Sequence, residues 1–573
     1  MNQKLSIETE RIDDIPLLQH YLDRLGVSST LDKHIPVHGN WQGVSLGLVV
    51  QVWLSYILSQ ADHRLCHVES WIEKRLHCFS ELVGLELNPL DWADDHLTVV
   101  LRLFANDDLW YPFEQAHARY LFRVYDLSKL PIRLDSTALS GYWPVTEDGL
   151  FQLGHSKDHR PDLAQLKIMM ATVDPMGCPL VTQVVDGSRA DDPLYIPAVD
   201  QVRESLQKEG LLYVGDSKMS SRATRAHIAY GQDHYLCPLP SRQLSQEELL
   251  EYLELLEQGH YELQEFSRET ADGYQEVFAQ GFELEQKMEV EIDGEKFCWT
   301  ERHLVIRSVQ KAEGMQEDLE ERIEKAIEAI LELNVRKQGR KRAETLEDLE
   351  PRVLQVLRKY RVEEYIDLLY EEMETEKHIR AWGKRKARVE VEKEALVQAT
   401  RSDTLVEEFG QVAGWRVYAT NAPVETLGLE EAILMYRENY RIDRNFHRLK
   451  GRPIGLKPMY LQRDDHAKGL VRLLSLALKV LTLAEHEVRE KLASREEELM
   501  GLYVGNPTRA TDKPTTERLL GAFKEVTWTK VNGPGFEYSE VTPLSIVQTT
   551  ILELLGFSET IYTELRPVGS HPP

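Results

Sequence analysis

The chain has 573 residues, too many for one hydrophobic core, so we expect three or four structural units. Its five cysteines are scattered without a CxxC pair, which argues against a disulfide framework or a structural zinc site and suits a reducing cytoplasm. The net charge of −27 counts against nucleic-acid binding overall, but phosphate contacts depend on local groups of Lys and Arg.

Three basic clusters stand out against this acidic background. For any one of them alone, a solvated helix face is the simpler interpretation. The clusters are Arg336, Lys337, Arg340, Lys341 and Arg342; Lys384, Arg385, Lys386 and Arg388; and Arg441, Arg444, Arg448, Lys450 and Arg452. The most apolar stretch, residues 44–58, is shorter than the roughly 20 residues of a membrane span, so we expect a buried helix there.

The first 240 residues change their periodicity near residue 130. Residues 1–127 carry apolar side chains at helical spacing, which predicts a helical N-terminal domain, a candidate for binding DNA ends. Residues 128–240 then predict strands at 131–135, 166–173, 180–185, 211–216 and 234–238, with helices at 193–208 and 220–230. This β-β-β-α-β-α-β order indicates a mixed sheet flanked by helices.

Residues 241–410 interrupt that pattern and are interpreted as an inserted α+β domain. An acidic helix comes first, then strands within residues 288–308 with Asp293 and Gly294 at a hairpin turn, then long charged helices over about 316–398. Strand and helix character returns over residues 411–490, which we assign to the second part of the sheet domain. Residues 491–573 predict a helical and tail region, a candidate for dimerisation.

Three carboxylates are the candidate catalytic groups. Asp135 and Asp216 each end a predicted strand, and the carboxyl ends of parallel strands share one edge of a sheet. Two carboxylates that approach there need a cation such as Mg²⁺, although a single Asp at a strand end more often caps a turn. At 100° per residue, Tyr436 and Lys450 share one helix face with the third acid, Asp443.

These motifs together resemble the DDE-type insertion-sequence transposases, whose last catalytic helix carries a Tyr-x2-Arg-x3-Glu-x6-Lys signature. Tyr436, Asp443 and Lys450 match its spacing, IRLDST and YVGDSKMSS match the strands of the first two acids, and residues 154–170 match the hairpin motif. Two positions depart from the signature, because Asn439 replaces its Arg and Asp443 replaces its Glu. The shorter Asp side chain sets the carboxylate about 1 Å further back, a displacement that can lower a rate by about 10²-fold.

The resemblance implies an RNase H-like core that cuts and joins DNA with two Mg²⁺ ions, or Mn²⁺ in their place. It implies that Asp135 bridges both metal ions and that Asp216 and Asp443 each hold one. The partners that it implies are the terminal inverted repeats of the insertion sequence that encodes the protein, target DNA and a second copy of the chain. The location that it implies is the cytoplasm of a bacterium or archaeon. The DNA contacts that we expect are Lys157, Arg160, Tyr436, Asn439 and Lys450.

The insertion carries a further expectation, that Trp299 stacks on a displaced base with Arg302 and Arg307 as phosphate contacts. The alternative is that Trp299 packs its own small sheet, and Trp382 is a second candidate platform. Two other functions stay open: a domesticated transposase that binds DNA without cutting it, motivated by Asp443, and a scaffold built on the charged helices. The scaffold leaves the three spaced acids unexplained.

Overall fold

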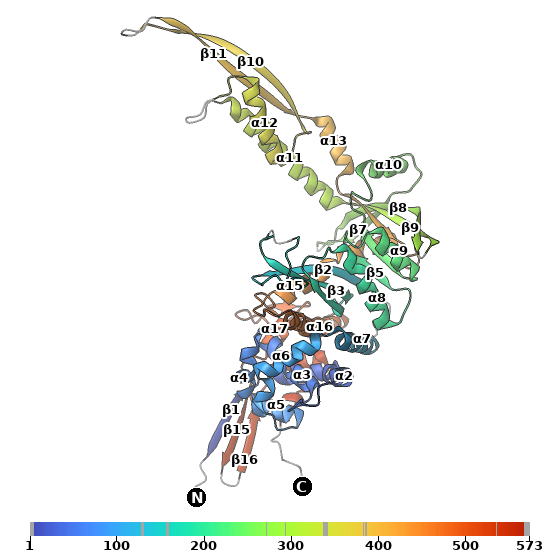
Figure 1. Ribbon diagram of the computed structural model, residues 1–573, viewed down its shortest axis with the longest axis vertical. Coiled ribbons are helices and arrows are strands. Elements are labelled where there is room, and N and C mark those ends of the chain that lie inside the picture. The colour runs from blue at the N-terminus through green and yellow to red at the C-terminus, as the bar shows by residue number, and fades with distance from the viewer. Residues whose placement is uncertain are drawn as a thin grey trace. The chain divides into compact units, whose positions relative to one another are not determined.

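The computed structural model is a mixed α/β fold, and it describes residues 5–125, 127, 131–155, 160–270, 272–292, 294–335, 342–381, 383, 387–533 and 536–565. The chain divides into two compact units (Figure 1). Unit 1 comprises residues 1–237, 289–299 and 434–573, and unit 2 comprises residues 238–288 and 300–433. The finer five-part division made from the sequence stays a prediction.

Unit 1 begins with a helical region, as its apolar periodicity predicts. The apolar residues of the third helix are almost all buried, including Trp53 and Ile57, which agrees with a buried helix rather than a membrane span. No helix within the described ranges is long and apolar enough to cross a membrane. The helices are α1 (Ile15–Arg24), α2 (Val27–His34), α3 (Leu46–Gln60), α4 (Val68–Glu73), α5 (Leu76–Val83), α6 (Asp94–Ala105) and α7 (Asp107–Val124).

The mixed sheet of unit 1 has the strand order β4-β3-β2-β5-β6. β2 is antiparallel to β3 and parallel to β5, and β5 is parallel to β6. Its elements follow the predicted chain order: β2 (Ile132–Gly141), β3 (Ala164–Val173), β4 (Cys178–Asp186), α8 (Tyr195–Leu206), β5 (Leu212–Gly215), α9 (Arg222–Tyr230) and β6 (His234–Pro238). Every residue of β3 is buried, as expected for a strand covered on both faces.

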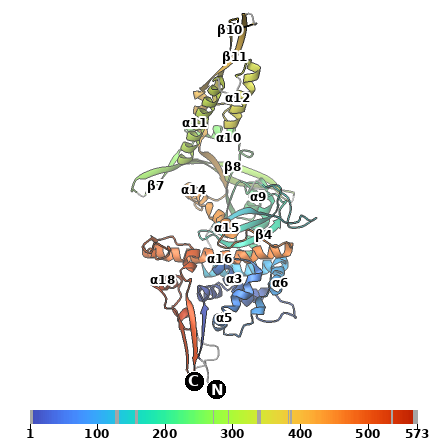
Figure 2. The same ribbon diagram turned by 90° about the vertical axis from the view of Figure 1, so that its left-hand side faces the viewer.

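The chain returns to unit 1 within α14 (Leu429–Arg437), and α15 (Tyr440–Lys450) then packs on β2. α16 (Asp464–Arg495) follows and packs against α6, α3 and β4, so it lies between the sheet and the N-terminal helices (Figure 2). Its residues from Gly469 to Glu485 are all buried, because apolar side chains occupy both of its faces.

A three-stranded sheet joins the two ends of unit 1. β1 (Ser6–Arg11) pairs with β15 (Thr527–Gly533), which pairs with β16 (Phe536–Val541). The expectation that residues 1–127 are wholly helical was therefore wrong for β1, because its partner lies at the opposite end of the chain. The other C-terminal elements are β13 (Leu499–Met500), β14 (Ala510–Thr511), α17 (Thr516–Gly521), α18 (Ile546–Leu555) and α19 (Thr560–Thr563).

Unit 2 contains strands in the order β12-β9-β8-β7, except for the parts of β8 and β9 within residues 289–299, which belong to unit 1. It also contains a helical and hairpin part. The second part differs from the prediction: residues 361–398 were expected to be helical, but they lie largely in a long hairpin, with Ile366 opposite Arg401. The elements are α10 (Gln246–Glu257), β7 (Gln264–Glu269), β8 (Gln275–Ile292), β9 (Glu295–Ser308), α11 (Val309–Leu331), α12 (Leu346–Tyr360), β10 (Ile366–Ile379), β11 (Arg388–Arg401), α13 (Asp403–Val412) and β12 (Trp415–Thr420).

Candidate active site

Asp135 and Asp216 lie at neighbouring strand positions. β2 and β5 are parallel, and the last pair of residues in register is Leu134 and Gly215. Asp135 and Asp216 are the residues that come directly after this pair. Neighbouring strands run about 4.8 Å apart, and residues in register point to the same face. Both carboxylates act electrostatically on the same hydroxyl, that of Tyr195. The sequence predicted that Asp135 ends its strand, but β2 continues to Gly141. Asp135 therefore lies inside β2, beside the end of β5, where Asp216 follows Gly215.

Tyr195, the first residue of α8, holds Asp216 in place. Its hydroxyl donates to Asp216 Oδ1 at 2.6 Å, and the backbone N–H of Lys218 donates to the same oxygen at 2.9 Å. Burial, together with the carboxylates of Asp216 and Asp135, raises the pKa of the Tyr195 hydroxyl, so it stays a donor at neutral pH. The sequence analysis missed Tyr195, because its helix meets the strand end only in the folded sheet.

Contacts near both ends of α15, one of them through Met435 of α14, hold it along the face of β2 that carries Asp135. Near the start of α15, Arg133 donates to Asn439 Oδ1 at 3.4 Å and to the carbonyl of Met435 at 2.7 Å. At its end, Lys450 Nζ lies 2.5 Å from Thr137 Oγ1. Residues 133, 135 and 137 are spaced by two and so point to the same face of the strand. These contacts therefore lie on both sides of Asp135.

Asp443 lies on α15 between those two contacts. At 100° per residue it is within about 40° of both Asn439 and Lys450 around the helix axis. Its side chain is exposed. Within the described residues, no group of three or more His, Cys, Asp or Glu side chains is arranged to hold a metal ion. Asp135, Asp216 and Asp443 are thus not gathered into one ligand set in this structure.

The predicted single helix carrying Tyr436 and Asp443 is interrupted. α14 ends at Arg437 and α15 begins at Tyr440, with turn hydrogen bonds such as Asn439 N to Tyr436 O between them. The angular relation between Tyr436 and Asp443 that a continuous helix would give is therefore not present. Lys450 and Asp443, which both belong to α15, keep theirs.

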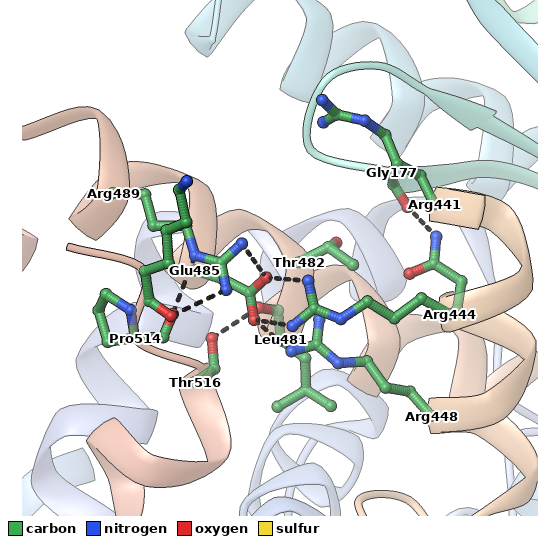
Figure 3. A network of polar contacts seen from close by, with 12 residues as sticks. Gly177, Arg441, Arg444, Arg448, Leu481, Thr482, Glu485, Arg489, Pro514 and Thr516 are labelled. Carbon is green, nitrogen blue, oxygen red and sulfur yellow. Dashed lines mark hydrogen bonds and ion pairs between the residues drawn. The ribbon is translucent and has the colours of Figure 1, made fainter. Parts of the chain in front are cut away.

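A buried carboxylate on α16 anchors the other side of α15 (Figure 3). Glu485 is paired with Arg444 at 2.7 Å, with Arg489 at 2.9 Å and with Arg448, which also reaches Glu517 at 2.9 Å. The third basic cluster is therefore not a solvated helix face, because Arg444 and Arg448 are engaged inside the protein. Their ion pairs hold the helix that carries Asp443 and Lys450.

The turn between β3 and β4 also fixes α15. Asn445 Nδ2 donates to the carbonyl of Gly177 at 2.6 Å (Figure 3). Arg441 donates to the carbonyl of Pro175. Gly177 has a φ of +69°, and an added Cβ would lie 2.8 Å from Asn445 Nδ2. A side chain at this position would therefore push the turn away from α15.

The remaining predicted DNA contacts lie in different settings. Lys157 and Trp382 are outside the described residues. Arg160 is exposed and ion-paired with Asp162 at 2.7 Å. Arg307 is half-buried and donates to the carbonyls of residues 413 and 410.

Arg302 and Trp299 are both engaged within the protein. The Arg302 guanidinium is buried and donates to the carbonyls of Ala422 and Leu427, each at 2.9 Å, and to Glu283. Its role as a phosphate contact stays a prediction, and both of its terminal nitrogens are engaged by acceptors within the protein. Trp299 is half-buried, stacks on Phe297 with ring centroids 5.6 Å apart, and donates to the Tyr235 hydroxyl at 2.9 Å. These contacts favour the packing interpretation of the indole.

No family model matches the sequence. No curated protein matches it. Among solved structures, the chain resembles the piggyBac transposase in a synaptic complex with hairpin DNA, at 8% sequence identity and a TM-score of 0.31, over 90% of this chain and 81% of that chain. The function proposed below therefore rests on the site of this chain alone.

Proposed function

We propose that this protein is a DDE-type transposase with an RNase H-like core, which cuts and rejoins DNA by metal-assisted phosphoryl transfer. The observation that carries the proposal is that Asp135, inside β2, lies beside Asp216, which directly follows the parallel strand β5, with α15 laid along the same face of β2. The strand order β4-β3-β2-β5-β6, with β2 central between an antiparallel and a parallel neighbour, supports an RNase H-like core.

The donor set at the strand ends fits a hard divalent cation. Asp135 and Asp216 offer carboxylate oxygens on one face, and Tyr195 already orients one of them. Such oxygens are the ligands that Mg²⁺ prefers, and Mn²⁺ accepts them as well. Two bound ions would polarise a phosphate oxygen and neutralise the charge that develops in phosphoryl transfer.

Each residue of the chain then has a distinct task. Asp135 and Asp216 hold the cation, and Tyr195 keeps the Asp216 carboxylate turned toward it. Lys450, which lies on the Asp135 side of β2, donates to a phosphate oxygen next to the reacting bond. Asp443 supplies the third carboxylate when DNA lies between α15 and the strand ends. The DNA ends of the element and the target are the substrates, and a second copy of the chain completes the complex.

The separation of Asp443 from the acid pair favours a second candidate, a transposase-derived protein that binds DNA without cutting it. One experiment separates the two. Purified full-length protein is incubated with supercoiled DNA that carries the flanking ends of its coding region, with Mg²⁺, with Mn²⁺ or with EDTA.

We expect metal-dependent nicking that Asp135→Asn and Asp216→Asn both abolish, with end binding in EDTA unchanged. These substitutions keep side-chain size and remove the charge that holds the metal. A matched control is Asp162→Asn, which alters an exposed carboxylate outside the pair. Unchanged nicking in the Asp135 or Asp216 variant would contradict the role of that residue in holding the metal. Binding of DNA ends without nicking by the native protein would favour the second candidate.

A further inference from the structure

A basic pocket opens in unit 1 next to the end of α15. It has a volume of about 850 Å³, within the range of ligand sites in proteins. One wall comes from the region between α3 and α5, and the other from the loop after α15, residues 451–460. Five cations line it, Arg64, Lys74, Arg75, Arg452 and Lys457, against one carboxylate. A chain with a net charge of −27 thus concentrates positive charge at this place.

The single carboxylate of the lining, Asp62, is already neutralised. Arg64 binds it with two hydrogen bonds of 2.9 and 3.0 Å, and the Tyr56 hydroxyl and His67 add two more. Burial disfavours its ionisation, but the hydrogen bonds from Arg64 and Tyr56 outweigh burial and lower the pKa of Asp62. An incoming anion therefore meets the other cations of the pocket without an unpaired negative charge between them.

Arg75 lacks full compensation inside the protein. Its side chain is only 11% exposed, and its closest carboxylate contact is Asp13 at 3.7 Å. One terminal nitrogen donates to the carbonyl of Trp71 at 3.2 Å, and the guanidinium lies over the Trp71 ring, but Nε is buried without a hydrogen-bond partner among the described residues. Burial lowers the pKa of Arg75, although the carboxylate of Asp13 opposes this. A buried guanidinium with an unused donor is stabilised by a bound anion.

The loop that forms the second wall is tied to both the site and the helical region. The backbone N–H of Lys457 donates to the carbonyl of Lys450 at 3.0 Å, so this pocket residue lies beside the last residue of α15. Gly455 has a φ of +79°, and an added Cβ would lie 3.0 Å from the carbonyl of Ala61. Tyr460, at the rim, has 64% of its surface exposed, as an aromatic side chain that stacks on a base requires.

We propose that this pocket binds the phosphodiester backbone of DNA on its way to the acid pair. The inference rests on the proposed function for the identity of the polyanion, and on the charge and position of the pocket for the contact itself. Lys74 and Arg452, both exposed, bind phosphate oxygens at the mouth, and Arg75 receives the phosphate that enters deepest. A free phosphate or nucleotide presents the same chemistry and is the competing source.

The test measures binding of a fluorescent 30-base-pair duplex to the full chain in EDTA, where no cleavage occurs, over a range of salt concentrations. The pocket variant is Lys74→Ala with Arg452→Ala. The matched control is Lys33→Ala with Arg123→Ala, which removes one Lys and one Arg that are exposed and outside the pocket. Thermal melting verifies that both variants are folded.

We expect the pocket variant to bind duplex about tenfold more weakly and to lose about 2 from the slope of log K against log salt, roughly 0.9 for each phosphate contact removed. The control should change neither value. Equal losses in both variants, or no loss in the pocket variant, would overturn the proposal.

Competition with inorganic phosphate and pyrophosphate separates the two sources. If millimolar pyrophosphate binds the native protein but not the pocket variant, while duplex binding is the same in both, the pocket is a site for free phosphates and the proposal is overturned. Nicking with Mg²⁺ is measured independently. If the native protein does not nick DNA but the pocket variant still binds duplex more weakly, only the cleavage proposal is contradicted. If the native protein nicks DNA but the pocket variant binds duplex normally, only the pocket proposal is contradicted.

Discussion

Arg133 and Asp174 form an ion pair that is almost wholly buried, with Nε 2.6 Å from Oδ2. Arg133 belongs to β2, two residues before Asp135, and its other nitrogens reach Asn439 and the carbonyl of Met435. One guanidinium therefore joins the strand of the first acid to the start of the helix that carries the third. Burial raises the pKa of the Asp174 carboxyl, and the nearby Arg133 opposes that rise.

Arg133→Ala is expected to lower the free energy of unfolding by about 3 to 5 kcal/mol, because it leaves Asp174 buried without its partner. Urea unfolding measures the change. Arg160→Ala is the matched control, since its pair with Asp162 is exposed and such pairs contribute about 1 kcal/mol or less. An Arg133 variant as stable as the Arg160 variant would mean that the buried pair contributes little to the fold.

Asp443→Glu restores one methylene and is expected to keep or raise metal-dependent nicking, whereas Asp443→Ala should remove it. The exposed position of Asp443 on α15 makes both substitutions compatible with folding, which thermal melting verifies. The longer side chain extends the carboxylate by about 1 Å, a distance that can change a rate by about 10²-fold. Full activity in Asp443→Ala would exclude this residue as the third metal ligand.

Trp299→Ala is expected to lower stability by about 1 to 3 kcal/mol, because the half-buried indole packs on Phe297 and donates to Tyr235. Tyr235→Phe, which removes only the hydrogen bond, should lower it by about 1 kcal/mol. The nicking defect of Trp299→Ala should then be equal on intact duplex ends and on ends with an unpaired terminal base. Rescue on the pre-opened ends, with an unchanged melting temperature, would instead identify Trp299 as a base platform.

Glu114→Gln is expected to change how stability depends on pH. Glu114 is buried in α7 and accepts a hydrogen bond from the N–H of Thr182 at 3.0 Å. Burial raises its pKa to about 7 from an ordinary 4.5, although Lys479 and Arg472 oppose the rise. Between these two values the native state holds a proton that the unfolded state releases, so the native protein loses stability as pH rises from about 4.5 to 7.

The neutral Gln avoids that loss and keeps an acceptor for Thr182. The stability of the variant relative to the native protein should therefore rise by up to about 3 kcal/mol between pH 4.5 and pH 8. Thermal melting across this range measures it, with the exposed Glu73→Gln as the control. Parallel pH curves for the native protein and Glu114→Gln would contradict the raised pKa.

Features that depend on residues close together in the chain could be predicted from the sequence alone. The apolar runs that lead into Asp135 and Asp216 were predicted, but not that β2 continues past Asp135 to Gly141, because its partner along that stretch is β3. Lys450 and Asp443 share a helix face because only two turns separate them. The contacts that position the site are not local, since Glu485 lies 41 residues from Arg444 and Arg133 lies 306 residues from Asn439.

The long hairpin of unit 2 was mispredicted for a different reason. Strands β10 and β11 carry Glu and Lys at many positions, which resembles the charge spacing of an exposed helix. Its buried residues, among them Ala395, Val397 and Ala399, alternate with period two over a short stretch only. They pack against α11 and α12, so that the strand pattern becomes clear only with its partners in place.

The pairing of β1 with β15 has a consequence for synthesis. Ile7 faces Val531, so β1 leaves the ribosome more than 500 residues before its partner strand exists. At the usual 5 to 20 residues per second, that interval is about 25 to 100 s. β1 must therefore remain an unpaired strand while nearly the whole chain is made, and its sequence, SIETER, keeps three charged side chains on it during that time. Slower translation lengthens the period in which this strand can pair with another nascent chain.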